Sequence, residues 1–456
     1  MPIKRISSGK LLLFLGDILI IILSINLAFI IRLKEPTINY LGLNNGLFTI
    51  ILMLAIFLTS FYIFDFYNTR EKFRSIRFLA NVGGSAIFVS LISIGLFYVF
   101  PYMIGRGVFL ISLILIEILI VTWRLLYPSF FRLTLPIRKV LIVGKGKPAE
   151  AIYSLLKKNP EYKVIGIMGD TSKKKDALEK ETIVRALSLE KIVNDYDVDD
   201  IIVTTEPLRN KQLNKALINC KMRGINIWDV PTFYEHFIDK LPVQYIKDRW
   251  FLYAAGFEKL GSNIYRRLKQ AIDLVISSII LIITFPLGVI IALAIKLNSR
   301  GPIFFIQERV GKNQKQFNLF KFRTMVSGAE KGEPMWAEED DPRITSVGKI
   351  LRKTRFDELP QLINVLKGEM SLIGPRPERE FFVKKLTQKI PFYSLRFSVK
   401  PGLTGWAQVF YRYGASEEDA LEKLQYELYY VKNMSLFLDI RIILKTIRII
   451  LFGMGR

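Results

Sequence analysis

Cysteine and histidine are almost absent from this chain of 456 residues. Cys220 and His236 are the only representatives of their types. A single cysteine excludes an intrachain disulfide framework and a zinc site built from paired cysteines. A single histidine argues against histidine-based triads and histidine-rich metal sites. Any catalysis must therefore rest on carboxylates, on cations and on a hard metal ion such as Mg²⁺.

The chain is too apolar for an ordinary soluble protein and carries a large positive charge. Hydrophobic residues make up 51% of it, its mean hydropathy is +0.28, and its formal net charge is +24. The apolar composition indicates membrane segments, and the length indicates two or three domains. The charge predicts an anionic partner, such as membrane lipids or a phosphorylated substrate. We expect no nucleic acid partner, because the basic residues lie largely beside apolar runs.

Four apolar runs open the chain, at about residues 11–31, 47–67, 78–100 and 107–127. Each is long enough to cross a hydrocarbon core of about 30 Å. Basic residues gather before the first run and between the second and third: Lys4, Arg5, Lys10, Arg70, Lys72, Arg74 and Arg77. The positive-inside rule predicts a four-helix transmembrane region at residues 1–133, with everything after Arg138 in the cytoplasm. Glu117 and Arg124 share a helical face and could pair, but we favour a position near the membrane interface.

Strands alternate with helices over residues 138–255, which predicts a Rossmann-like α/β domain with a parallel sheet. The expected strands are residues 140–146, 164–170, 200–205 and 224–230. Residues 144–149 form a variant of the G-x-G-x-x-G/A phosphate-binding turn, and Asp170 lies where a ribose-binding acid would be. Lys145 and Pro148 are unusual in that fingerprint. We therefore favour a regulatory or assembly domain and predict no cofactor-binding residues.

A fifth apolar run extends from Leu274 to Ile295, with Pro286 near its middle. A transmembrane helix would leave one end outside, whereas both flanks carry the basic residues typical of the cytoplasmic side. Because Pro286 can bend a helix, we expect a helix–break–helix hairpin that enters and leaves the membrane on the cytoplasmic side. A proline-kinked fifth span is the alternative. Residues 435–452 suit a helix that lies in the membrane interface or packs on the core.

Two adjacent carboxylates surrounded by cations mark residues 353–377. Asp357 and Glu358 open an apolar helix that is expected to run to about Lys367 and to stop at Gly368. The surrounding cations are Arg352, Lys353, Arg355, Arg376 and Arg379. Asp at a helix N-cap with Glu in the first turn is also ordinary helix chemistry. Two acids beside many cations nevertheless suit a Mg²⁺-bound diphosphate, because acids hold the metal and cations hold the phosphate oxygens.

Five motifs stand out within residues 262–456. They are Lys321-Phe-Arg-Thr-Met325, Asp357-Glu-Leu-Pro-Gln-Leu-Ile-Asn364, Ser371-Leu-Ile-Gly-Pro-Arg-Pro377, Pro401-Gly-Leu-Thr-Gly405 and Tyr426-Glu-Leu-Tyr-Tyr-Val-Lys-Asn433. Together they resemble the bacterial sugar transferases that begin glycan assembly on a lipid, the polyprenyl-phosphate hexose-1-phosphate transferases. The four apolar runs and the middle domain resemble the long form of that family. Residues 411–416 resemble its exopolysaccharide, EpsB-like branch.

The resemblance implies a monotopic catalytic domain at residues 262–456, mainly helical α/β, with a re-entrant membrane helix at about 272–297. It implies that Asp357 is the nucleophile and holds Mg²⁺, and that Glu358 is its neighbour in a catalytic dyad. The expected phosphate-binding residues are Lys321, Arg323, Arg376 and Arg412. Two features depart from the family pattern. Residues 410–413 replace the usual Asn-Gly-Arg-Asn, and Glu427 stands where Asp is usual, so no catalytic role is assigned to Glu427.

The implied reaction transfers a hexose-1-phosphate from a UDP-sugar to polyprenyl (undecaprenyl) phosphate, with an aspartyl-phosphosugar intermediate and release of UMP. Its place would be the cytoplasmic face of a bacterial inner membrane, and a homodimer is left open. The alternative is a membrane-anchored nucleotide-sugar dehydratase or reductase. That chemistry needs a Tyr-x-x-x-Lys pair well downstream of the phosphate-binding turn, and the candidate pair, Tyr153 and Lys157, comes too early. A non-enzymatic export scaffold would leave the carboxylates and their cations without a purpose.

Overall fold

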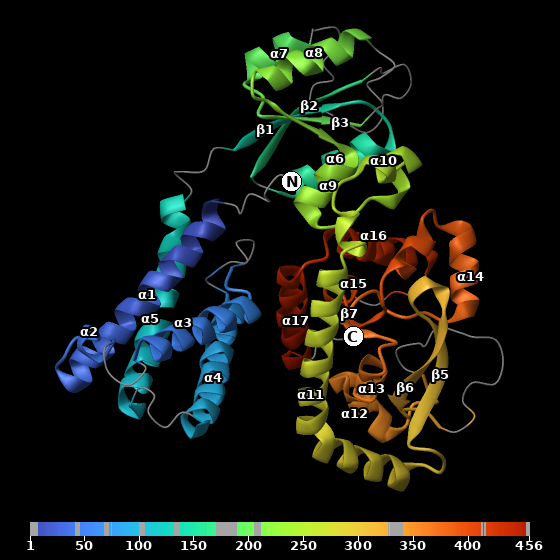
Figure 1. Cartoon of the computed structure of the whole chain (residues 1–456). Coiled ribbons are helices and arrows are strands. Elements are labelled where there is room, and N and C mark those ends of the chain that lie inside the picture. The colour runs from blue at the N-terminus through green and yellow to red at the C-terminus, as the bar shows by residue number, and fades with distance from the viewer. Residues whose placement is uncertain are drawn as a thin grey trace. The chain divides into compact units, whose positions relative to one another are not determined.

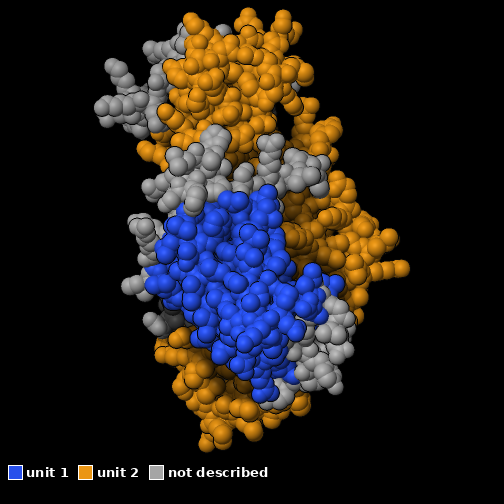
Figure 2. Space-filling model, turned by 90° about the vertical axis from the view of Figure 1, so that its left-hand side faces the viewer, with its two compact units in different colours: residues 1–135 blue, residues 136–456 orange. Residues whose placement is uncertain are grey.

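The computed structural model describes residues 8–41, 46–67, 73, 75–99, 105–131, 137–159, 161–169, 189–204, 211–326, 328, 341–411, 414 and 416–452. The chain divides into two compact units, Met1–Leu135 and Pro136–Arg456, which are coloured separately in Figure 2. The expected separation of residues 138–255 from residues 262–456 as distinct domains stays a prediction.

The first unit consists of apolar helices. They are α1 (Ser8–Leu33), α2 (Ile38–Leu41), α3 (Gly46–Ile63), α4 (Ile76–Val99) and α5 (Arg106–Phe131), shown in blue and cyan in Figure 1. All but the short α2 are long and apolar enough to cross a membrane. Gly16 lets α1 and α5 approach closely, because a Cβ there would lie 2.8 Å from the Trp123 indole. These helices match the four apolar runs and mark a membrane protein.

Arg124 pairs with Asp17 rather than with Glu117, and its expected position near the membrane interface stays a prediction. Its guanidinium is fully buried and binds both carboxylate oxygens of Asp17 on α1, at 2.8 and 2.7 Å. Its Nε also donates to the carbonyl oxygen of Phe66 at 3.2 Å. A charge among apolar helices must find a partner, and a sequence offers no direct sign that a residue 107 positions away supplies it. Within the described residues, both Glu117 carboxylate oxygens are buried without a hydrogen bond.

The second unit begins with a four-stranded parallel sheet in the order β2-β1-β3-β4. Its strands are β1 (Arg138–Val143), β2 (Tyr162–Met168), β3 (Asp200–Val203) and β4 (Asn226–Asp229). Helices α7 (Leu189–Tyr196) and α8 (Lys211–Met222) cover one face, and α6 (Lys147–Lys157) and α9 (Val230–Ile238) cover the other (Figure 1). Leu141 and Val143 pack on the first face and Val140 and Ile142 on the second. The expected parallel sheet is confirmed, whereas Asp170 lies outside the described residues.

The remaining elements build a main core, which includes two very short parallel strands, β7 (Ser371–Ile373) and β8 (Gly402–Thr404), and a smaller apolar cluster between α11, β6 and α12. A long antiparallel hairpin lies beside them, formed by β5 (Phe304–Val310) and β6 (Gln316–Phe322). The longer helices are α11 (Asn263–Asn298), α14 (Glu380–Lys389), α16 (Glu417–Asn433) and α17 (Leu436–Leu451). The shorter α-helices are α10 (Asp248–Tyr253), α12 (Ser346–Thr354), α13 (Gln361–Leu366) and α15 (Trp406–Phe410). The 3₁₀ turns are η2 (Val243–Tyr245), η3 (Phe257–Leu260), η4 (Lys312–Gln314), η5 (Phe356–Glu358) and η6 (Tyr393–Ser398).

Helix α11 contains the fifth apolar run. The chain stays helical from Asn263 to Asn298 with Pro286 inside the helix, so the expected break in the helix is absent. The expected bend is present, because α11 consists of two straight parts joined by a sharp turn (Figure 1). Its first half packs on the main core through Ile276, Ile280 and Leu281, and its end packs on α12 and β6 through Ile291 and Ile295. The two parts of α11 therefore pack in two separate apolar clusters of the second unit. The middle of α11 exposes large apolar side chains: Ile282, Ile283, Phe285 and Ile290.

Helix α17 packs on the core with one face. Leu438 and Ile442 are buried in that core, while Phe437 and Ile440 on the remaining surface are exposed. The predicted packing of residues 435–452 on the core is therefore confirmed for one face of this helix only. The exposed apolar half is compatible with contact with a membrane surface.

Candidate active site

The two carboxylates lie on a tight turn rather than at the start of a long helix. Helix α12 ends at Thr354, and Arg355 takes a left-handed backbone conformation with φ of 63°. The 3₁₀ turn η5 then carries Asp357 and Glu358, and α13 begins only at Gln361. The expected continuous helix to Lys367 is thus interrupted at its beginning. The turn places both carboxylates in the interior, where each residue is more than nine-tenths buried.

Glu358 is the centre of a cluster of cations. Its Oε1 accepts a hydrogen bond from Arg376 Nη2 at 2.7 Å and from Lys321 Nζ at 3.3 Å, and Arg355 Nη1 lies 3.6 Å away. Burial alone would raise the pKa of Glu358, but Arg376, Lys321 and Arg355 together outweigh burial and hold that pKa well below its usual range. Glu358 is therefore ionised and its charge is balanced within the site.

Asp357 differs sharply from its neighbour. Within the described residues, its Oδ1 is buried and has no hydrogen-bond partner. Burial and the negative charge of Glu358 raise the pKa of Asp357 above its usual value, against the opposing pull of Lys321 and Arg376. Burial likewise lowers the pKa of the Lys321 ammonium, although Glu358 opposes that shift. Asp357 thus presents a poorly solvated carboxylate oxygen beside a pair of cations, an arrangement suited to nucleophilic attack.

Lys321 reaches the dyad because β6 is fixed against α13. The side chain of Asn364 on α13 accepts a hydrogen bond from the backbone N–H of Phe320 at 3.1 Å and donates to the carbonyl oxygen of Asn318 at 2.7 Å. Asn364 is fully buried. It therefore ties the end of β6, and with it Lys321, to the helix that follows Glu358. The sequence analysis did not predict this role, because it noted Asn364 only as the last residue of the motif that begins at Asp357.

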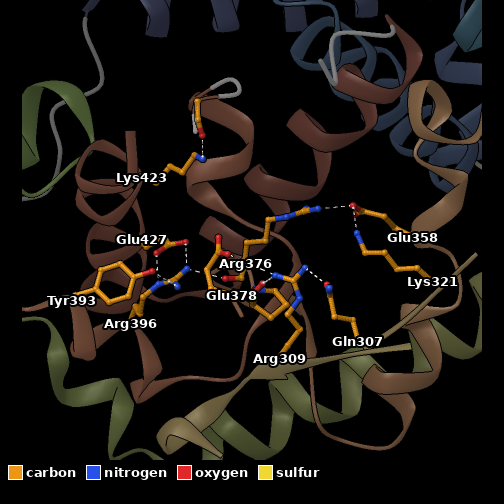
Figure 3. A network of polar contacts seen from close by, with 12 residues as sticks. Gln307, Arg309, Lys321, Glu358, Arg376, Glu378, Tyr393, Arg396, Lys423 and Glu427 are labelled. Atoms are coloured by element: carbon orange, nitrogen blue, oxygen red, sulfur yellow. Dashed lines mark hydrogen bonds and ion pairs between the residues drawn. The ribbon is translucent and has the colours of Figure 1, made fainter. Parts of the chain in front are cut away.

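Arg376 is carried by the turn that follows β7. The turn is narrow because Gly374 packs directly on its neighbours, where a Cβ would lie 2.4 Å from the carbonyl oxygen of Lys400. Gly402 donates its backbone N–H to the carbonyl oxygen of Pro375 at 2.8 Å. The side chain of Arg309 donates to the carbonyl oxygen of Pro377 at 3.3 Å. Figure 3 shows Arg376 extending from this turn toward Glu358.

Two buried residues behind the turn were not assigned to the site by the sequence. Arg396 and Glu427 form a two-bond ion pair, with Nε to Oε2 at 2.7 Å and Nη2 to Oε1 at 2.8 Å. Arg396 Nη2 also donates to the carbonyl oxygen of Arg376 at 2.8 Å (Figure 3). Glu427 stands where the family usually has Asp, and this departure was the one signal in the sequence that drew attention to the position.

The other two predicted phosphate-binding residues are not part of this cluster as described. Arg323 is buried, and its Nη2 donates to the carbonyl oxygen and the hydroxyl of Ser299 at the end of α11, at 2.8 and 2.9 Å. Within the described residues, its Nε and Nη1 are buried without hydrogen bonds. Arg412 lies outside the described residues. The structure therefore brings together Asp357, Glu358, Lys321 and Arg376.

Comparison with known proteins places this site in a family. The sequence model described as bacterial sugar transferase matches residues 264–453, which include every residue of the cluster. The uncharacterized sugar transferase EpsL of Bacillus subtilis is 39% identical over 189 residues, which are 41% of this chain and 89% of EpsL. This chain belongs to the bacterial sugar transferase family.

Longer members of the family resemble more of this sugar transferase. The UDP-N-acetylgalactosamine-undecaprenyl-phosphate N-acetylgalactosaminephosphotransferase of Aeromonas hydrophila is 40% identical over 241 residues, 53% of this chain and 56% of that protein. The undecaprenyl-phosphate glucose phosphotransferase of Komagataeibacter xylinus is 30% identical over 359 residues, 75% of this chain and 64% of that protein. The chain thus spans 56% and 64% of the lengths of these two relatives. Their names differ in the sugar, so the similarity leaves the sugar open.

Proposed function

We propose that this sugar transferase moves a hexose-1-phosphate from a UDP-sugar to undecaprenyl phosphate, giving undecaprenyl-diphosphate-sugar and UMP. The observation that carries the proposal is the unpartnered, buried Oδ1 of Asp357 beside a Glu358 whose charge is balanced by Arg376 and Lys321. Such a site offers one oxygen for attack and two cations for phosphate oxygens. The relatives' names, which combine undecaprenyl phosphate with glucose or N-acetylgalactosamine, support the choice of acceptor and donor class.

In the first step, an oxygen of Asp357 attacks the sugar-bearing phosphorus of the donor. The bond from that phosphorus to the bridging oxygen breaks, and UMP leaves with the bonding electron pair. An aspartyl-phosphosugar remains on the protein. The buried position of Asp357 favours this step, because a carboxylate oxygen that is largely shielded from solvent and accepts no hydrogen bond from the described residues is a stronger nucleophile.

In the second step, a phosphate oxygen of undecaprenyl phosphate attacks the same phosphorus. The bond from phosphorus to the Asp357 oxygen breaks, and the carboxylate is regenerated. One pocket thus handles two phosphate groups in turn, as covalent catalysis allows. The same cations serve both steps, because in both transition states negative charge lies on the same phosphoryl oxygens.

Glu358 keeps the cations in place between turnovers. The Arg376 side chain is 33% exposed, so it can exchange part of its contact with Glu358 for a contact with a phosphate oxygen. Lys321 lies deeper, with its side chain 20% exposed, and approaches the same carboxylate from β6. Arg323 and Arg412 remain proposed contributors to phosphate binding. For Arg323 the support is its buried Nε and Nη1, which lack hydrogen bonds within the described residues.

A Mg²⁺ ion fits the donor set of this site. The unpartnered Oδ1 of Asp357 is a hard anionic ligand, and Mg²⁺ in phosphoryl-transfer sites is held by one or two carboxylates together with substrate phosphates. Within the described residues, no three His, Cys, Asp or Glu side chains form a group that could hold a metal ion, so substrate phosphates and water would have to supply most of its ligands. When bound, Mg²⁺ would neutralise diphosphate charge. We propose Asp357 as its protein ligand.

We further propose that α11 enters and leaves the membrane on the cytoplasmic side of a bacterial inner membrane. Support comes from its two ends, which both contact other elements of the second unit. Near its start, Asp273 accepts a hydrogen bond from Ser371 Oγ on β7 at 2.7 Å, and after its end, Ser299 accepts hydrogen bonds from Arg323. The exposed apolar middle of α11 would lie in lipid. This arrangement would hold the pocket at the depth of the lipid phosphate. Whether the chain forms a homodimer stays a prediction.

An assay of UMP release tests the proposal. The purified full chain is given undecaprenyl phosphate, Mg²⁺ and, in turn, each member of a panel of UDP-sugars. We expect sustained UMP release with one or a few of these sugars, and only when the lipid is present. If no UDP-sugar in a broad panel releases UMP, the proposed function is wrong. No described feature of the sheet domain favours the dehydratase or reductase alternative.

A further inference from the structure

A fully buried ion pair lies directly behind the turn that carries Arg376. Arg396 and Glu427 are each at most 5% exposed and share two hydrogen bonds of 2.7 and 2.8 Å. Arg396 Nη1 donates in addition to the hydroxyl of Tyr393 at 3.0 Å. Burial by itself would lower the pKa of Arg396, but Glu427 and Tyr393 outweigh it and raise that pKa. The guanidinium therefore stays charged and has several fixed acceptors.

The pair also reaches the active-site turn. Arg396 Nη2, already bonded to Glu427, donates to the backbone carbonyl oxygen of Arg376 at 2.8 Å. The next two residues of the turn are held by β5. Arg309 donates to the carbonyl oxygen of Pro377 at 3.3 Å, and Val310 donates its N–H to the carbonyl oxygen of Glu378 at 2.9 Å. In Figure 3 the carbonyl side of Arg376 faces Arg396 while its guanidinium extends the other way, to Glu358. The backbone of Arg376 is thus held from behind.

We propose that Arg396 and Glu427 are positioning residues that fix the backbone of Arg376 and so set where its guanidinium meets Glu358 and the substrate phosphate. This inference rests on the proposed function, in which Arg376 stabilises the charge of the transferred phosphoryl group. A long arginine side chain has several rotatable bonds, and a small shift of its backbone moves its guanidinium away from a narrow target. A buried ion pair adds little to stability compared with an apolar pair, but it can specify one geometry.

The two residues come from different elements and meet only in the fold. Arg396 lies on η6, before β8, and Glu427 lies in the middle of α16. Glu427 provides both oxygens of its carboxylate, so the orientation of Arg396 as well as its charge is defined. A change at Glu427 should therefore alter catalysis only through Arg376. That dependence distinguishes positioning from a general contribution to folding.

The test is a double-mutant cycle on the full chain, with kcat for UMP release as the readout. Glu427→Gln keeps the shape of the side chain and removes its charge, and it is made in the wild-type and in the Arg376→Ala background. Glu427→Asp is made alongside, because it keeps the charge in case the Gln variant does not fold. Glu418→Gln, at an exposed position on the same helix, is the matched control. Thermal melting of each variant reports on folding.

We expect kcat to fall about tenfold or more for Glu427→Gln in the wild-type background and less than about twofold in the Arg376→Ala background. Glu427→Asp should show the same dependence with a smaller loss, and Glu418→Gln should match the wild type. Equal losses in both backgrounds, or a wild-type kcat for folded Glu427 variants, would overturn the inference while the proposed function stands. A wild-type chain that releases no UMP would instead overturn the proposed function, and the inference with it.

Discussion

The Arg376→Ala substitution removes the guanidinium that lies 2.7 Å from Glu358 Oε1. Loss of one preorganised charge donor from an active site costs about 2.7–4 kcal/mol of transition-state stabilisation. Here the side chain is 33% exposed, and Lys321 lies 3.3 Å from the same oxygen, so water and a second cation offset part of the loss. We therefore expect a cost of about 2–3 kcal/mol, or a fall in kcat/KM of about 30- to 150-fold.

Initial rates of UMP release over a range of UDP-sugar concentrations measure this effect. Arg249→Ala, an exposed arginine on α10, is the matched control and should behave as the wild type. Arg376→Lys should fall between wild type and Arg376→Ala, because it restores a charge but not the planar fork of donors. A folded Arg376→Ala variant with wild-type kcat/KM would refute the assignment of this arginine to the phosphate pocket.

Three further predictions concern the dyad, the membrane topology and the helical bundle. Glu358→Gln should slow turnover but keep part of the UMP–UDP-sugar exchange, because Asp357 is still present; complete loss of exchange would contradict this division of roles. Single cysteines at Gly261 and Ser299 in an otherwise cysteine-free chain should both resist a membrane-impermeant maleimide until cells are opened, whereas labelling of position 299 alone would show a fifth span. Asp17→Ala should cost about 3–5 kcal/mol of stability by leaving a buried arginine unpaired, and an unchanged melting temperature would refute that pairing.

Periodic and local patterns predicted much of the fold. Strands β1 and β3 were found because each contains a short, buried apolar run, as expected for strands covered on both faces. The apolar helices were found from their length alone. By contrast, β7 and β8 pair through three residues each, too few to give a pattern. The turn at Arg355 depends on a left-handed backbone at a non-glycine residue, which no propensity predicts.

Contacts between distant residues were the part that the sequence could not supply. The cluster of charges in residues 353–377 drew attention to Asp357, Glu358 and Arg376, and the family resemblance added Lys321. The fold brings these four residues together. Residues two apart on a strand share a face, so Arg323 was expected to join Lys321. Strand β6 ends at Phe322, however, and Arg323 lies beyond it and binds Ser299 at the end of α11. The pair of Arg396 and Glu427 joins positions 31 residues apart and could be recognised only in three dimensions.

The covalent route through Asp357 is the central claim, and exchange of labelled UMP into the UDP-sugar without any lipid tests it most directly. Exchange needs only the first step and its reversal, so the second substrate does not enter. With a UDP-sugar that supports turnover, the wild-type chain should exchange label and Asp357→Asn should show none, because an amide cannot form the acyl-phosphate. Exchange by folded Asp357→Asn above a trace, or a wild-type chain that turns over with lipid but never exchanges without it, would contradict the account.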